Sequence, residues 1–123
     1  MKYRFTDTQL AGNKKAKDCY ALLDLLNETH HQKIKMTITR ARGGHAHIRE
    51  DRFTLPTYVF SRPEVYMFYY VIHEFTHCLG FWGHDLYFKR KEQDILQLFD
   101  IKIHYTKAYP KALYSNGQKV YGK

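Results

Sequence analysis

The spacing of apolar residues along the chain predicts three helices. From Asn13 to Asn27, apolar side chains recur every three or four residues with lysines on the opposite side, which is typical of an amphipathic helix over about 14–28. Residues 63–79 are apolar almost throughout, so we expect a buried helix there. Apolar periodicity resumes from Asp85 to Phe99 and predicts a further helix that faces the core.

Polar residues and glycines mark the expected ends of the buried helix. Ser61 stands three residues before Glu64, the spacing of a capping box, and Pro63 suits a first helical turn. Gly80 and Gly83 are expected to end the same helix.

Two stretches between the first two helices alternate as half-buried strands do. They are KIKMTITRA and HAHIREDRFTLP, separated by Gly43 and Gly44, and they predict a small sheet of about three strands. Residues 101–123 hold five lysines, four tyrosines and no acidic residue, with Asn116-Gly117 between alternating flanks. This segment is expected to form either a basic hairpin or a loosely ordered arm. The predicted fold is α+β.

Length and composition favour one globular unit over residues 1–123. The chain has 123 residues, 44% of them hydrophobic. Its formal net charge of +8 fits either a polyanionic partner such as DNA or a basic surface that serves only solubility. Its two cysteines, Cys19 and Cys78, lie too far apart in sequence to resemble a zinc knuckle or a disulfide scaffold. No signal peptide or membrane span is recognisable, so we expect an intracellular monomer in the cytoplasm or near the nucleoid or nucleus.

The predicted buried helix contains the sequence His73-Glu74-Phe75-Thr76-His77, an H-E-x-x-H motif. Residues four apart lie on one helical face, so both imidazoles can bind one ion. Glu74 is then well placed to act as a general base toward water activated by Zn²⁺. The alternative is a chance match of satisfied polar residues, but burying them in so apolar a helix is costly unless they are paired or metal-bound.

A catalytic zinc site requires a third protein ligand. His84 is the preferred candidate because it follows His77 by seven residues, just past two glycines that permit a turn. A carboxylate from the next helix, Glu92 or Asp94, is the competing choice. A metzincin arrangement fails because its last histidine falls on Gly83.

The stretch HEFTHCLGFWGHDLYFK resembles the active-site segment of SprT-like and WLM-type minimal gluzincin peptidases. In that family a third histidine follows the turn in an H-x-x-x-F context, which here is His84 to Phe88. The resemblance implies a zincin-like fold, metal ligands at His73, His77 and His84, catalysis by Glu74, and a core anchor at Phe88. It also implies a protein or peptide substrate, and some members of the family act on proteins bound to DNA.

Other residues receive less specific interpretations. Ile48 to Leu55 is either an edge strand that binds substrate or an ordinary structural strand. His45 and His47 are expected to be polar strand residues rather than extra metal ligands, and Cys78 a core residue. His30 and His31 are expected to end the first helix. The lysines and tyrosines of residues 101–123 either bind nucleic acid or cover the domain. The leading hypothesis is a zinc metallopeptidase, and the alternatives are a nucleic-acid-binding module with structural zinc and an inactive interaction domain.

Overall fold

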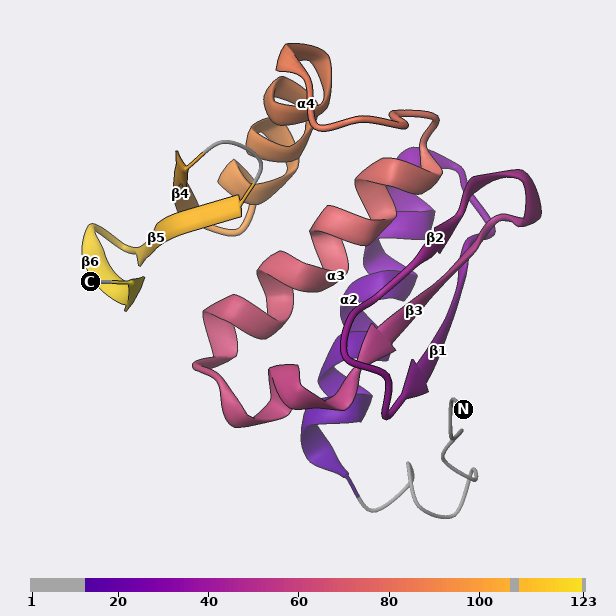
Figure 1. Ribbon diagram of the computed structural model, residues 1–123, viewed down its shortest axis with the longest axis horizontal. Helices are drawn as coiled ribbons and strands as arrows, with labels where there is room; N and C mark the ends of the chain where they lie inside the picture. The colour runs from indigo at the N-terminus through magenta and orange to yellow at the C-terminus, as the bar shows by residue number, and fades with distance from the viewer. Residues whose placement is uncertain (1–12, 107–108, 123) are drawn as a thin grey trace.

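The computed structural model describes residues 13–106 and 109–122, which form helices and two small sheets (Figure 1). The α-helices of this part are α2 (Lys14–His30), α3 (Glu64–Cys78) and α4 (Leu86–Gln97). The first sheet contains β1 (Lys35–Thr39), β2 (Ala46–His47) and β3 (Arg52–Pro56), and the second contains β4 (Ile101–Thr106), β5 (Tyr109–Ser115) and β6 (Gln118–Gly122). Two short 3₁₀ helices, η1 (Ile48–Glu50) and η2 (Thr57–Ser61), flank β3. The protein is therefore α+β.

All three predicted helices form within a few residues of their expected ends. Asn13 begins α2 by accepting a hydrogen bond from the Ala16 amide at 3.0 Å. Asp85 caps α4 in the same way, through the Phe88 amide at 3.0 Å. The end of α2 also agrees, because His30 is its last residue and His31 caps it in the left-handed conformation with a φ of 54°.

The predicted capping box at the start of α3 is wrong. Ser61 ends η2, and its hydroxyl donates to the Tyr58 carbonyl at 2.7 Å instead of capping α3. Pro63 takes the cap position, where its carbonyl accepts the Tyr66 amide at 2.9 Å and no side chain is needed. The 3₁₀ turn over Thr57–Ser61 satisfies Ser61 locally, which the capping pattern alone does not reveal.

The first sheet has the strand order β1-β3-β2, with β1 parallel and β2 antiparallel to β3. Three strands were expected, but the stretch 45–56 forms two of them. The chain leaves β2 through η1 and turns at Asp51, whose φ of 50° lies in the left-handed region. This reversal makes β3 the central strand.

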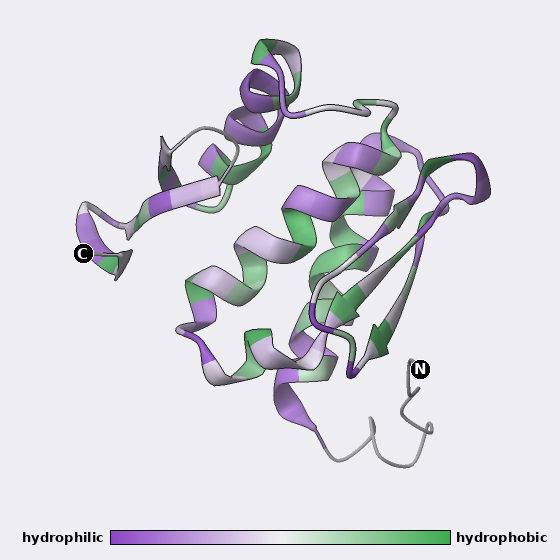
Figure 2. Ribbon diagram, viewed as in Figure 1, coloured by the Kyte–Doolittle hydropathy of each residue, from purple (hydrophilic) through white to green (hydrophobic). Residues whose placement is uncertain are grey.

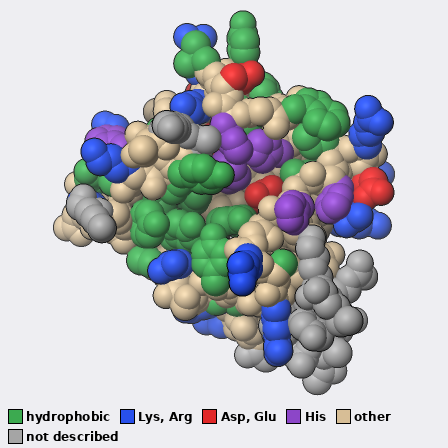
Figure 3. Space-filling view, viewed as in Figure 1, with side chains coloured by type: hydrophobic (Ala, Val, Ile, Leu, Met, Phe, Trp, Pro, Cys, Tyr) green, Lys and Arg blue, Asp and Glu red, His purple; other side chains and the backbone are tan. Residues whose placement is uncertain are grey.

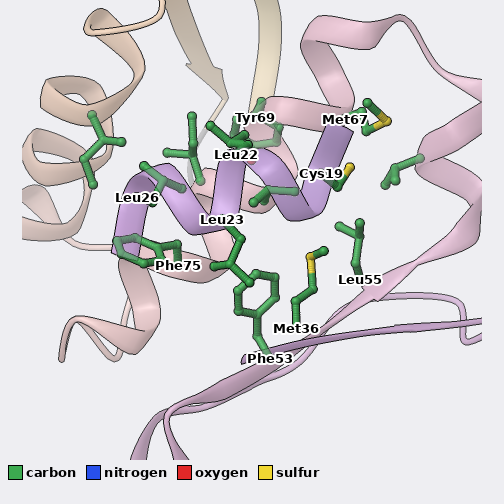
Figure 4. Packing of buried hydrophobic residues seen from close by; sticks show 14 of the residues in the cluster. Cys19, Leu22, Leu23, Leu26, Met36, Phe53, Leu55, Met67, Tyr69 and Phe75 are labelled. Atoms are coloured by element: carbon green, nitrogen blue, oxygen red, sulfur yellow. The ribbon is translucent and has the colours of Figure 1, made fainter. Parts of the chain in front are cut away.

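One face of the first sheet forms the core with α2 and α3. Met36 pairs with Phe53 and Ile38 with Leu55, so strand alternation brings the four apolar side chains to the same face. They pack with the buried side of α2, including Leu22, Leu23 and Leu26, and with Phe75 of α3 (Figure 4). The hydropathy of the ribbon follows this arrangement, with hydrophobic positions gathered where helices and strands face one another (Figure 2).

The basic C-terminal segment is an ordered antiparallel sheet. Asn116 and Gly117 both have positive φ, 53° and 80°, and join β5 to β6 in a two-residue hairpin turn. The predicted hairpin is therefore correct, and β4 adds a third strand on its other side. Tyr121 packs on Tyr66 of α3 with ring centroids 4.7 Å apart, which attaches the sheet to the rest of the fold.

Candidate metal centre

One face of α3 carries the polar residues of the candidate site. The site residues of α3 form a single stripe along the helix, because each lies three or four residues from another member. They are Tyr66, Tyr69, Tyr70, His73, Glu74 and His77. All of them but Tyr70 are buried, and all six line a cleft. The helix therefore presents both histidines and the carboxylate of H-E-x-x-H to the same space.

The turn after α3 brings His84 to the first two histidines. Gly80 adopts a φ of 109°, and the chain folds back until the Phe81 carbonyl lies 2.7 Å from Nδ1 of His77. Asp85, next to His84, then caps α4. Phe88, one turn further, is fully buried against the imidazoles, and its ring centroid is 4.4 Å from that of His77. The expected anchor at Phe88 is confirmed.

The three histidines point their Nε2 atoms at one another. Nε2 of His84 lies 3.2 Å from that of His73 and 3.1 Å from that of His77. Ligand atoms of a tetrahedral zinc site with bonds of about 2.0–2.1 Å stand about 3.3 Å apart. Three histidines thus lie close enough to bind one metal ion, and their spacing fits such an ion.

Hydrogen bonds fix the orientation of two of these imidazoles. Nδ1 of His77 faces the Phe81 carbonyl, which only accepts, so this nitrogen carries the proton and Nε2 offers a lone pair. Nδ1 of His73 lies 2.6 Å from Oε2 of Glu92, and donation to that carboxylate leaves its Nε2 free in the same way. Lone pairs that converge on one point repel one another unless a cation lies between them. Such a convergence is a property of metal sites.

Burial keeps the imidazoles of His77 and His84 in the neutral form that binds metal. It lowers the pKa of His77 to about 4, against the opposing effect of the Phe81 hydrogen bond. Burial, followed by the proximity of His73, also lowers the pKa of His84. Protons therefore compete weakly with a metal ion for both side chains at neutral pH.

Glu74 lies beside the histidines in a buried environment. Its side chain is 6% exposed, and burial raises its pKa to about 7, with His73 lowering it and Glu92 raising it further. A carboxyl group that titrates near neutral pH is suited to proton transfer. Gly44 makes room for it, because a Cβ on Gly44 would stand 3.2 Å from Oε1 of Glu74 and 2.6 Å from the Thr54 carbonyl oxygen.

A cleft of about 380 Å³ opens in front of these groups. Aromatic residues dominate its walls, and two of them, Trp82 and Tyr109, remain largely exposed. The space-filling view shows histidine side chains at the surface beside a band of hydrophobic ones (Figure 3). The lining residues outside the H-E-x-x-H motif and His84 are Ala46, Ile48, Tyr58, Tyr66, Tyr69, Tyr70, Trp82, Tyr109 and Pro110.

The predicted substrate strand, Ile48 to Leu55, is wrong. Ile48–Glu50 is a 3₁₀ helix, and β3 is paired on both sides, so it has no free edge. Among the described strands, the free edge near α3 belongs to β2. The Thr54 amide donates to the His45 carbonyl at 2.9 Å, and antiparallel alternation then directs the N–H and C=O of Ala46 away from β3. The Gly44 amide faces the same way and donates to the Tyr70 hydroxyl at 2.8 Å.

The other residues considered from sequence lie outside the histidine cluster. Glu92 contacts His73 through Nδ1, behind the proposed ligand atom, and Asp94 is exposed on α4. His47 is half-buried with Nδ1 4.0 Å from Glu50, and His45 is exposed. Cys78 is buried, as expected, and its thiol donates to the Arg52 carbonyl at 3.5 Å.

Two participants were missed by sequence reasoning. Tyr70 was detectable, because it lies three residues before His73 on the same helical face. Tyr105 donates a hydrogen bond to Glu92 from β4, and nothing in the local pattern of residues 101–123 indicates that contact. Within this basic segment, Tyr105 and Tyr121 pack on the domain, while Lys107 and Lys123 lie outside the described residues.

A second, larger hollow of about 570 Å³ lies between α4 and the second sheet. Its walls include Gln93, Gln97, Lys102 and Asn116, and the three histidines that could hold a metal ion, the one such group within residues 13–106 and 109–122, lie elsewhere. The candidate functional site is therefore the histidine cleft.

Comparisons with family models, curated proteins and solved structures give no match to this chain. None of the described helices has both the length and the apolar character needed to cross a bilayer.

Proposed function

We propose that this protein is a zinc-dependent metallopeptidase with a zincin-like fold of the minimal gluzincin type. His73, His77 and His84 hold the metal, and Glu74 is the general base. The observation that carries the proposal is the convergence of three Nε2 atoms beside a buried carboxylate in an open cleft. The resemblance of residues 73–89 to SprT-like and WLM-type peptidases supports the same assignment.

Zinc is the metal that best suits this donor set. Three neutral imidazoles leave one position of a tetrahedral ion for water or substrate, which is the pattern of a catalytic site. When bound, zinc supplies Lewis acidity that acidifies water and polarises a carbonyl group.

Glu74 performs the proton transfers in this mechanism. A bound cation favours its carboxylate form, so Glu74 is ready to accept a proton at neutral pH. It takes the proton from the attacking water and passes it to the nitrogen of the leaving amine, as a general base that then acts as a general acid. Its buried position beside His73 keeps this carboxylate close to the reacting atoms.

The substrate backbone binds along the free edge of β2. Ala46 lines the cleft, and its N–H and C=O, which strand alternation directs away from β3, are the main-chain groups with which an extended peptide would pair. The Tyr70 hydroxyl accepts the Gly44 amide and shares a side-chain hydrogen bond with Tyr58; by exchanging the latter it would donate its proton toward a developing oxyanion. The substrate is a protein or peptide, and the net charge of +8 favours proteins associated with DNA.

The proposal is tested by hydrolysis of a quenched fluorescent peptide library. Chelation should abolish hydrolysis and one equivalent of zinc should restore it. Salt-sensitive DNA binding that persists after chelation, together with no hydrolysis in the zinc-loaded protein, would instead favour a nucleic-acid-binding module with a structural metal.

A further inference from the structure

We propose that the C-terminal sheet is part of the metal centre: Tyr105 of β4 and Glu92 of α4 together position His73 for metal binding. The inference rests on the metal site of the proposed function and extends it to two residues that do not touch the ion. It also gives the segment 101–122 a defined role. Both residues are positioning residues, because they act through His73.

Glu92 has hydrogen-bond partners on both oxygens. It is fully buried, with Oε2 2.6 Å from Nδ1 of His73 and Oε1 accepting a hydrogen bond from the Tyr105 hydroxyl. Among the described residues, His73 is the one basic side chain that pairs with it. Burying a carboxylate that has no lysine or arginine partner costs free energy unless another positive charge lies close to it. A metal ion on Nε2 of His73 provides that charge across the ring.

The sheet holds Tyr105 rigidly in place. Strand alternation in β4 places Tyr105 on the same side as Ile101 and Ile103, and both isoleucines are buried in the core. Opposite the step from His104 to Tyr105, β5 contributes one extra residue, Lys111. Such bulges re-aim strands beside functional sites. The Nζ of Lys89 lies 5.2 Å from the centroid of the Tyr105 ring, which adds a contact from α4.

The hydrogen bonds link Tyr105 to Glu92 and Glu92 to His73, and their donors and acceptors determine which His73 nitrogen carries the proton. Tyr105 donates to Glu92, and Glu92 accepts the Nδ1 proton of His73, so the Nε2 lone pair faces His84. Removing the Tyr105 hydroxyl leaves Oε1 of Glu92 unsatisfied and free to rotate. The tautomer and orientation of the His73 imidazole then depend on the weaker contact of Nδ1 with the Tyr69 hydroxyl at 3.3 Å, which weakens metal binding.

The test compares zinc affinities of Tyr105→Phe, Glu92→Gln and the control Tyr114→Phe by chelator competition, without any peptide present. Tyr114 lies on β5 of the same sheet, with its ring against His104 and outside the cleft. We expect affinity to fall about 10–100-fold in Glu92→Gln and about tenfold in Tyr105→Phe, as for other groups that orient ligands, and to stay unchanged in Tyr114→Phe. The ¹⁵N NMR signals of the His73 ring in the zinc-loaded protein should change in the first two variants alone.

Wild-type affinity in both Tyr105→Phe and Glu92→Gln, or an equal loss in Tyr114→Phe, would overturn the inference. If Tyr105→Phe does not fold, the affinity and His73 signals of Glu92→Gln decide. A wild-type protein that binds zinc but cleaves no peptide would contradict the proposed peptidase and leave this inference standing. Variants that bind zinc normally while the wild type cleaves peptides would contradict this inference and leave the proposed peptidase standing.

Discussion

Nε2 of His77 lies 3.1 Å from Nε2 of His84, although His77 is near the end of α3 and His84 just precedes α4, with a turn between the two helices. The positive φ of Gly80, the hydrogen bond between Phe81 and His77, and the Asp85 cap of α4 together produce this approach. His84 thereby lies close enough to His73 and His77 to serve as the third ligand that a catalytic zinc site requires.

Replacement of His84 should remove the metal. In His84→Ala two ligands remain, so zinc measured by elemental analysis after dialysis should fall from about one equivalent per chain toward zero. His47→Ala is the matched control, because His47 is half-buried but lies outside the cluster. Equal zinc in the two variants would show that His84 is not a ligand.

The buried carboxyl of Glu74 should make the metal-free protein depend on pH. Its folded pKa of about 7 lies above the ordinary value of 4.5, so the folded state binds more protons between these limits and loses stability as pH rises through them. Glu74→Gln removes this penalty. At 1.36 kcal/mol per pKa unit, the variant should gain up to about 3 kcal/mol over wild type at pH 8, and the gain should vanish near pH 4.5.

Urea unfolding of both proteins with chelator present measures this difference. The lowered pKa of His77 has the opposite sign, because protonation of the unfolded state below pH 6.5 destabilises the folded one. Since His77 is present in both proteins, it cancels in the comparison. A stability gap that is the same at pH 4.5 and pH 8 would contradict the raised pKa of Glu74.

Gly44 should tolerate no side chain. A Cβ there would stand 2.6 Å from the Thr54 carbonyl oxygen and 2.9 Å from Cε1 of Tyr70, so β2 must shift. We expect Gly44→Ala to lower the free energy of unfolding by about 1–3 kcal/mol and to reduce hydrolysis. At Gly43 the nearest atom is the Tyr70 hydroxyl at 3.9 Å, so Gly43→Ala should change stability by less than about 0.5 kcal/mol. Equal effects would argue against this close packing.

The free edge of β2 can be tested with proline. Ala46→Pro removes an N–H that strand alternation directs away from β3, so the first sheet should remain intact. Ala46→Ser keeps that N–H and serves as the control. We expect kcat/KM to fall at least tenfold in the proline variant and little in the serine variant; normal peptide hydrolysis by Ala46→Pro would exclude binding along β2.

Much of this arrangement is local and therefore readable from sequence. The three helices follow from the period of their apolar residues, and the stripe from Tyr66 to His77 follows from helix geometry alone. The turn chemistry of Asn116-Gly117 likewise identifies the C-terminal hairpin. His84 was identified by its spacing from His77, and the structure brings it into the same cluster.

The contacts that sequence reasoning missed join distant segments. The strand order β1-β3-β2 depends on the reversal through η1 and Asp51, so alternation alone mistook the central strand for an edge. Glu92 has the chemistry of a ligand, and its position against Nδ1 of His73 became evident only when α4 was placed. Tyr105 reaches Glu92 through the pairing of β4 with β5, which no local pattern encodes.

The most direct test of the proposed function is the rate of peptide hydrolysis by Glu74→Gln beside wild type, with both proteins loaded to one zinc per chain. The amide keeps the shape of Glu74 but cannot accept the proton of the attacking water. We predict that the variant retains zinc and loses hydrolysis by about 10²–10⁴-fold. Undiminished hydrolysis in Glu74→Gln would contradict the assignment of the base and, with it, the mechanism proposed for this site.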